Sequence, residues 1–205
     1  MDKNNFMKNI AVLISGNGTN LQAIIDQTKT GNIKGNIVAV ISNKADAYGL
    51  ERAKQARISG YFVDHKGITR EEHEQKIIDI LEKNKVDLVI LAGYMRVVTS
   101  LFVNKYKHRL INIHPALLPA FPGTDGYGDT FNYGCKVGGC TVHFVDEGVD
   151  TGPIIIQKVN EIKEDDTLES FKQRGLEIEH QALPEAVKLF CEDKLQIEGR
   201  KVKIL

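Results

Sequence analysis

IAVLISGNGTNLQAII, residues 10–25, joins a strand-like run to a helical pattern through a glycine-rich turn. The apolar run Ile10 to Ile14 is typical of a buried strand, and Leu21, Ile24 and Ile25 place an apolar stripe on one face of the segment that follows. A strand that leads directly into a helix is the repeating unit of a parallel sheet covered by helices. This stretch therefore predicts an α/β fold.

The alternation of strand-like and helical segments continues through the first half of the chain. Apolar spacing and start signals, such as the capping-box pair Thr69 and Glu72, indicate helices between the strands. The further strand-like runs cover residues 37–42, 61–63, 86–91 and 110–114. We therefore expect a doubly wound, mostly parallel sheet with a Rossmann-like first half.

The second half contains two more strand-like runs and one long helix. The strands cover residues 141–145 and 154–159, and the helix runs from about Thr167 to Leu189, where Pro184 should kink or divide it. Between the two halves, residues 123–139 are rich in glycine and show no clear periodicity. Because long irregular loops in compact domains are often functional, we expect a mobile loop beside the site, with a plain surface connection as the alternative.

Length and composition limit the kind of protein. A chain of 205 residues suffices for one large α/β domain, so we expect a single domain over 1–205, with a flexible N-terminus at about 1–8 and a closing hairpin at about 195–205. The 27 basic and 27 acidic side chains balance, which disfavours nucleic acid and membrane surfaces as partners. Residues 1–5 lack the apolar core of a signal peptide, so we expect a cytosolic protein with free thiols and a small-molecule ligand.

Two short polar segments end apolar runs, Asn112-Ile113-His114-Pro115 and Asp150-Thr151-Gly152-Pro153. Alternation places Asn112 and His114 on one face of a strand that Pro115 ends, so His114 lies at the carboxyl end, where open α/β sheets bind ligands. An amide, an imidazole and a carboxylate can together polarise a carbonyl group and move a proton. Asn112, His114 and Asp150 are therefore the candidate catalytic residues.

Two other interpretations of these residues remain open. A single buried histidine on a strand is often a core residue whose ring binds a backbone carbonyl, although the neighbouring Asn112 favours a joint role because strands disfavour asparagine. A metal site made by His114, His143 and Asp150 is the second alternative, but His143 shows no paired ligand spacing. We expect no metal.

The glycine-rich turn Ser15-Gly16-Asn17-Gly18-Thr19-Asn20 opens the first helix. Backbone donors and the helix amino terminus make such a turn a site for an anion, typically a phosphate group. A dinucleotide is less favoured, because Leu21 replaces the third glycine of the fingerprint and no acidic residue follows the second strand. A purely structural turn is the alternative.

In this order along the chain, these segments resemble the phosphoribosylglycinamide formyltransferase family of purine biosynthesis. The match extends from about Ile10 to Pro184, with its most specific segments at 14–24, 91–96, 112–115, 117–119, 140–145 and 150–153. The resemblance implies a formyltransferase fold. It also implies transfer of the formyl group of 10-formyltetrahydrofolate, a cosubstrate, to the amine of glycinamide ribonucleotide, which gives formylglycinamide ribonucleotide and tetrahydrofolate on the route to IMP.

Residue by residue, the resemblance implies two sets of contacts. Gly18, Thr19 and Asn20 match positions that hold the nucleotide phosphate, and Glu179 matches one that contacts its ribose; Arg70, Met95, Arg96, Val97 and Val98, with Asn112, match folate contacts. Without the resemblance, Glu179 would be interpreted as a solvated helix face and Arg70 as a surface charge. The chain departs from the family in the glycine-rich loop, where Asp125 stands at a position that more often holds histidine and residues 128–130 look less helical than usual.

The implied mechanism needs a donor for the formyl oxygen and a route for a proton. Asn112 would donate to that oxygen, as would a protonated His114, whose charge Asp150 would stabilise. The group or water that relays the proton to the departing folate nitrogen remains open.

A formyltetrahydrofolate hydrolase and a methionyl-tRNA formyltransferase share this logic, but each adds a further domain. A non-catalytic nucleotide-binding module would leave the three polar residues without a purpose. We expect a monomer or a homodimer.

Overall fold

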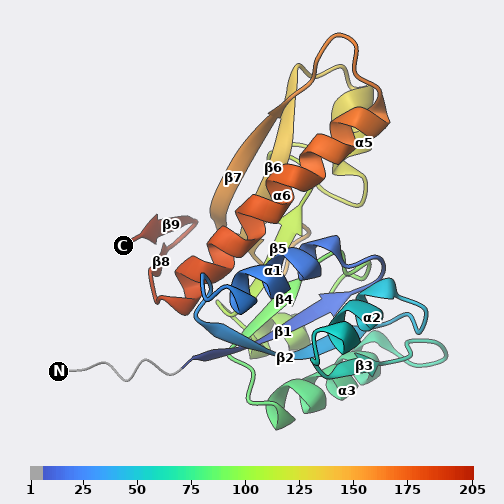
Figure 1. Ribbon diagram of the computed structural model, residues 1–205, viewed down its shortest axis with the longest axis vertical. Helices are drawn as coiled ribbons and strands as arrows, with labels where there is room; N and C mark the ends of the chain where they lie inside the picture. The colour runs from blue at the N-terminus through green and yellow to red at the C-terminus, as the bar shows by residue number, and fades with distance from the viewer. Residues whose placement is uncertain (1–6) are drawn as a thin grey trace.

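The computed structural model describes residues 7–205, in which strands and helices alternate (Figure 1). The first half consists of β1 (Lys8–Ile14), α1 (Thr19–Lys29), β2 (Gly35–Ser42), α2 (Tyr48–Gln55), β3 (Gly60–Phe62), α3 (Arg70–Lys83), β4 (Leu88–Leu91), α4 (Ser100–Lys105) and β5 (Leu110–His114). The second half consists of α5 (Gly126–Asn132), β6 (Val137–Phe144), β7 (Ile154–Glu161), α6 (Leu168–Cys191), β8 (Leu195–Glu198) and β9 (Lys201–Ile204). The expected flexible N-terminus lies outside the described residues up to residue 6, and β1 already begins at Lys8.

The described strands form one nine-stranded sheet in the order β3-β2-β1-β4-β5-β6-β7-β9-β8. Strands β3, β2, β1, β4 and β5 are parallel, whereas β6 is antiparallel to β5 and to β7. The hairpin of β8 and β9 extends the sheet through a parallel contact between β9 and β7. The predicted doubly wound, mostly parallel sheet with a closing hairpin is thus confirmed. The carboxyl ends of β1, β4 and β5 meet at one edge, where the direction of strand addition reverses.

Strict alternation along the central strands divides the core between the two faces of the sheet. One face packs under α1 and α6, which lie side by side in Figure 1, and receives Ile10, Val12 and Ile14 of β1. The other face packs against α3 and α4 and receives Ala11 and Leu13. Because helices cover both faces, the buried strands are apolar on both sides, as parallel sheets generally are.

Two helices form from the signals that their sequences carry. At the start of α3, the Thr69 hydroxyl accepts a hydrogen bond from the Glu72 amide at 3.1 Å, and the Glu72 carboxylate accepts one from the Thr69 amide at 2.8 Å. This reciprocal pair is the predicted capping box. Helix α6 is continuous through Pro184, so of the two effects expected of this proline, division does not occur.

The glycine-rich segment between β5 and β6 is more regular than expected. Residues 126–132 form α5, and β6 begins at Val137, four residues before the predicted strand. Asp125 caps α5 by accepting a hydrogen bond from the Gly128 amide at 3.2 Å, and the Thr130 hydroxyl bonds the Gly126 carbonyl at 2.6 Å. These local bonds offset the low helix propensity of glycine, which is why residues 128–130 are helical against expectation.

Candidate active site

The carboxyl end of β5 carries the two polar side chains that the sequence analysis singled out. Ile111 and Ile113 point into the core under α1 and α6, so Asn112 and His114 lie on the opposite face, as predicted. Asn112 pairs with Leu91 of β4 on one side and with His143 of β6 on the other. The amide and the imidazole therefore share one site at the sheet edge.

Asp150 reaches this site from the loop between β6 and β7, 38 residues after Asn112 in the chain. Its backbone is left-handed, with φ of 55°, a conformation that aspartate tolerates better than most residues. Its Oδ2 lies 3.3 Å from Nδ1 of His114 and accepts a hydrogen bond from the Gly123 amide at 2.9 Å. Oδ1 lies 3.4 Å from Nδ2 of Asn112. The structure thus brings the three candidate catalytic residues together.

The electrostatics of the site favour an ionised Asp150. Burial by itself would raise the pKa of its carboxyl, but the hydrogen bond with His143, the Gly123 amide and the charges of His114 and His143 together outweigh burial and lower the pKa below its ordinary value. A carboxylate held ionised in this way can stabilise positive charge on a neighbouring imidazole.

His143 belongs to the same cluster, which the sequence analysis considered only as a metal-site alternative. Its Nε2 lies 3.3 Å from Nδ2 of Asn112 and 3.6 Å from Oδ1 of Asp150, and its Nδ1 faces the Phe144 carbonyl at 2.9 Å. With a proton on Nδ1 for that carbonyl, Nε2 of the neutral ring accepts from Asn112, whereas a ring protonated on both nitrogens directs Nε2 to Asp150 as a donor. The signal in the sequence was the alternation of Thr141 and His143 with core residues of β6, but the partner strand could not be identified from it.

Both proposed donors to a formyl oxygen are engaged in this structure. Nε2 of His114 lies 2.7 Å from the Phe121 carbonyl, and the amide protons of Asn112 face His143 and Asp150. The interpretation of His114 as a core residue bonded to a carbonyl is therefore right about one ring nitrogen, while the other nitrogen faces Asp150. His114 can donate to a substrate oxygen through Nε2 after the bond to Phe121 is released.

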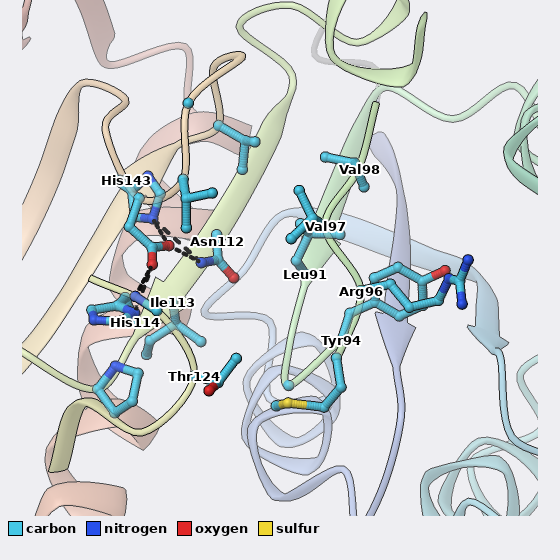
Figure 2. A pocket seen from close by; sticks show the side chains of 18 of the residues that line it. Leu91, Tyr94, Arg96, Val97, Val98, Asn112, Ile113, His114, Thr124 and His143 are labelled. Carbon is cyan, nitrogen blue, oxygen red and sulfur yellow. Dashed lines mark hydrogen bonds and ion pairs between the residues drawn. The ribbon is translucent and has the colours of Figure 1, made fainter. Parts of the chain in front are cut away.

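The cluster opens onto a pocket of about 220 Å³ with a mixed polar and apolar lining. Figure 2 shows Asn112, His114 and His143 on one side of the pocket and Leu91, Val97 and Val98 on the other, with Thr124 below Asn112. Of the residues that resemblance assigned to folate, the lining includes Met95, Arg96, Val97, Val98 and Asn112. Arg70 does not line this pocket. It is the first residue of α3, and its side chain is exposed.

The glycine loop lies after β1 at the same sheet edge and contacts α6. Gly18 caps α1 in a left-handed conformation with φ of 67°, which glycine adopts without strain. Asn20, in the first turn of α1, donates from Nδ2 to Oε2 of Glu179 at 2.7 Å. The interpretation of Glu179 as a solvated helix face was wrong, because the side chain is buried and also accepts a hydrogen bond from the Tyr127 hydroxyl.

Ser15 connects the glycine loop to the segment at Met95. Its hydroxyl accepts a hydrogen bond from the Met95 amide at 2.8 Å and donates to Oδ1 of Asn43 at 2.6 Å. The two candidate binding regions therefore share one hydrogen-bonded frame. Across residues 7–205 no three His, Cys, Asp or Glu side chains are grouped as a metal ion would require. None of the helices in that range is long and apolar enough to cross a membrane.

Comparison with known proteins agrees with this geometry. A family model described as formyl transferase matches residues 8–187. The phosphoribosylglycinamide formyltransferase of Bacillus subtilis is 44% identical over 183 residues, which cover 89% of this chain and 94% of that protein. A crystal structure of glycinamide ribonucleotide transformylase 1 from Symbiobacterium toebii superimposes with a TM-score of 0.95 at 48% identity, covering 97% of this chain and 94% of the other.

Larger relatives contain the same region as one part. The trifunctional purine biosynthetic protein adenosine-3 of Chironomus tentans is 45% identical over 196 residues, and the match spans 94% of this chain but 14% of that protein. The strand order, the Asn112, His114 and Asp150 cluster, and the family match from residue 8 to residue 187 lead to one conclusion: this chain belongs to the formyl transferase family.

Proposed function

We propose that this protein transfers the formyl group of 10-formyltetrahydrofolate to the amine of glycinamide ribonucleotide in purine biosynthesis. The observation that carries the proposal is the convergence of Asn112, His114 and Asp150 at a sheet edge that also bears a glycine loop. The names and coverage of the Bacillus subtilis and Symbiobacterium toebii relatives support the same substrates.

The two substrates bind at different parts of the carboxyl edge of the sheet. The pocket lined by Met95 to Val98 has the mixed apolar and polar character suited to the folate ring system, and its lining includes Asn112. The glycine loop and the amino terminus of α1 offer backbone donors to a phosphate group, and Glu179 offers acceptors to the ribose hydroxyls. The amine and the formyl carbon would then meet at His114 and Asp150.

The reaction needs one bond to form and one to break. The amine nitrogen attacks the formyl carbon, and negative charge develops on the formyl oxygen, where Asn112 and His114 can donate hydrogen bonds. A proton then leaves the former amine and reaches the folate nitrogen, whose bond to the formyl carbon breaks. Asp150, 3.3 Å from His114, stabilises the imidazolium during these steps. In this scheme Nε2 of His114 leaves the Phe121 carbonyl, and Nδ2 of Asn112 turns one proton away from His143 or Asp150, before the oxyanion forms.

The first experiment is to incubate the purified protein with 10-formyltetrahydrofolate, with and without glycinamide ribonucleotide, and to measure tetrahydrofolate and formylglycinamide ribonucleotide. We expect tetrahydrofolate to appear in equal amount to the formylated nucleotide and only when the nucleotide is present. Release without the nucleotide would assign the cluster to hydrolysis. Absence of release in both reactions would overturn the proposal in favour of a nucleotide-binding module.

Three expectations from the sequence stay predictions beside this proposal. They are a cytosolic location, a monomeric or homodimeric state, and independence from nucleic acid. Size-exclusion chromatography with light scattering at two protein concentrations measures the second directly.

A further inference from the structure

Tyr127 connects α5 to the carboxylate that we assign to the nucleotide ribose. It is the second residue of α5 and 6% exposed, and its hydroxyl donates to Oε1 of Glu179 at 2.7 Å. Oε2 of the same carboxylate accepts from Nδ2 of Asn20 at 2.7 Å. One side chain from α5 and one from α1 therefore hold both oxygens of a buried carboxylate on α6.

The position of the Tyr127 hydroxyl is set by close packing. The ring meets Phe171 edge to face, with centroids 5.5 Å apart, and lies against Gly175 of α6. A Cβ atom at Gly175 would lie 2.3 Å from Cζ and 2.5 Å from the hydroxyl oxygen of Tyr127. Glycine is unfavourable inside a helix, so its presence here is explained by the space that the ring occupies.

The carboxylate of Glu179 retains capacity for a ligand. Burial raises its pKa, and the hydrogen bonds from Asn20 and Tyr127 oppose that rise by stabilising the ionised form. Each oxygen has accepted one of these bonds and keeps a second lone pair. Oδ1 of Asn20 is also buried, and among the described residues no donor reaches it. These acceptors match the hydroxyl groups of a ribose.

We infer that Tyr127 is a positioning residue whose hydroxyl orients Glu179 toward the nucleotide ribose. The inference rests on the proposed function. Without the hydroxyl, one oxygen of Glu179 loses its fixed donor, and the carboxylate can rotate away from the direction in which the ribose approaches. The ring alone keeps α5 seated on Gly175, so the contacts of Phe121 and Gly123 with the catalytic cluster stay in place.

The test is Tyr127→Phe, which removes the hydroxyl and keeps the ring. We expect the KM for glycinamide ribonucleotide to rise about tenfold, the effect of losing one hydrogen bond to a charged group, with less than about a threefold change in kcat and in the KM for 10-formyltetrahydrofolate. Tyr133→Phe is the matched control, because Tyr133 caps the carboxyl end of α5 and is 79% exposed. We expect this control to match the wild type.

A double-mutant cycle with Glu179→Gln separates positioning from a general structural effect. If Tyr127 acts through Glu179, Tyr127→Phe should change the nucleotide KM by less than about twofold in the Glu179→Gln background. An unchanged nucleotide KM in the single variant, equal losses for both substrates, additive effects in the cycle, or an unfolded Tyr127→Phe protein would each overturn the inference. Failure of the proposed function is a different result, because it appears in the wild type as no nucleotide-dependent transfer.

Discussion

His114 and Asp150 face each other across the end of the sheet, with Nδ1 of the imidazole 3.3 Å from Oδ2 of the carboxylate. The second carboxylate oxygen lies toward Asn112, and the second imidazole nitrogen bonds the Phe121 carbonyl. A carboxylate in this position can orient the ring and stabilise a positive charge on it, an arrangement suited to an acid-base histidine.

His114→Ala and Asp150→Asn should each lower kcat by roughly a hundredfold or more, the scale of losing a general acid or base. The physical reason is that one variant removes the proton carrier and the other removes the charge that stabilises it. Steady-state kinetics with both substrates, beside thermal unfolding curves to confirm folding, measure the effect. Wild-type turnover from either folded variant would refute the assignment.

Asn112→Ala should reduce kcat/KM by the equivalent of roughly 2–4 kcal/mol, as removal of an oxyanion donor does. Asn112→Asp is the sharper variant, because it keeps the shape but places a second carboxylate about 3.4 Å from Oδ1 of Asp150. We expect an equal or larger loss for it, measured at saturating concentrations of each substrate in turn. If only the KM for the folate rises and kcat is unchanged, Asn112 would instead be a binding residue and not an oxyanion donor.

The lowered pKa of Asp150 predicts how the free energy of unfolding depends on pH. A carboxyl whose pKa is lower in the folded than in the unfolded chain contributes stability that is complete above its unfolded value of about 3.9 and is lost as pH falls through the folded value. The free energy of unfolding of the wild type minus that of Asp150→Asn should therefore be the same at about pH 6 and about pH 5, and smaller at about pH 3.5. Urea titrations measure it.

Asp193→Asn provides the reference for this pH experiment, because Asp193 pairs with Lys8 at the surface and its side chain is 75% exposed. Exposed ion pairs contribute little to stability, so the free energy of unfolding of this variant should match that of the wild type at each pH. A difference for Asp150→Asn that stays constant or grows in acid would contradict the assigned direction of the pKa shift.

Gly18→Val should weaken binding of the nucleotide more than binding of the folate. Gly18 is left-handed, and a Cβ atom there would lie 2.9 Å from Cα of Gly49, so a branched side chain must displace the glycine loop. We expect the nucleotide KM to rise at least about tenfold, on the scale of one lost phosphate contact. In Gly16→Ala, the added Cβ would meet no described heavy atom within 4 Å, so this control should keep the wild-type KM. Equal losses for both substrates would argue against a phosphate loop.

The cysteines should differ in reactivity. Burial raises the pKa of Cys140 and of Cys191 to about 12, whereas Cys135 is partly exposed. Because the thiolate is the nucleophile, iodoacetamide at pH 8 should modify Cys135 in the native protein and all three thiols after denaturation. Intact-mass spectrometry counts the modified thiols. Rapid native modification of Cys140 would show that β6 opens readily.

Several parts of the fold and the site could be predicted because their signals are local. The capping box of α3 needs Thr69 and Glu72 three residues apart, and the alternation of β5 by itself puts Asn112 and His114 on one face. Helix α5 was not predicted, because its glycine-rich sequence has a low helix propensity that indicates a loop. The Asp125 side chain caps the helix and offsets this low propensity.

The sequence by itself determined the strand, glycine loop and helix of the first unit, and the face that carries Asn112 and His114, because both depend on the spacing of neighbouring residues. Only the tertiary structure decided that β6 pairs with β5 in the register that sets His143 opposite Asn112. It also decided that Glu179 is buried between Asn20 and Tyr127, and that Phe121 bonds His114. These contacts join residues distant in the chain, and they depend on the path of loops and on packing against α6, which periodicity does not encode.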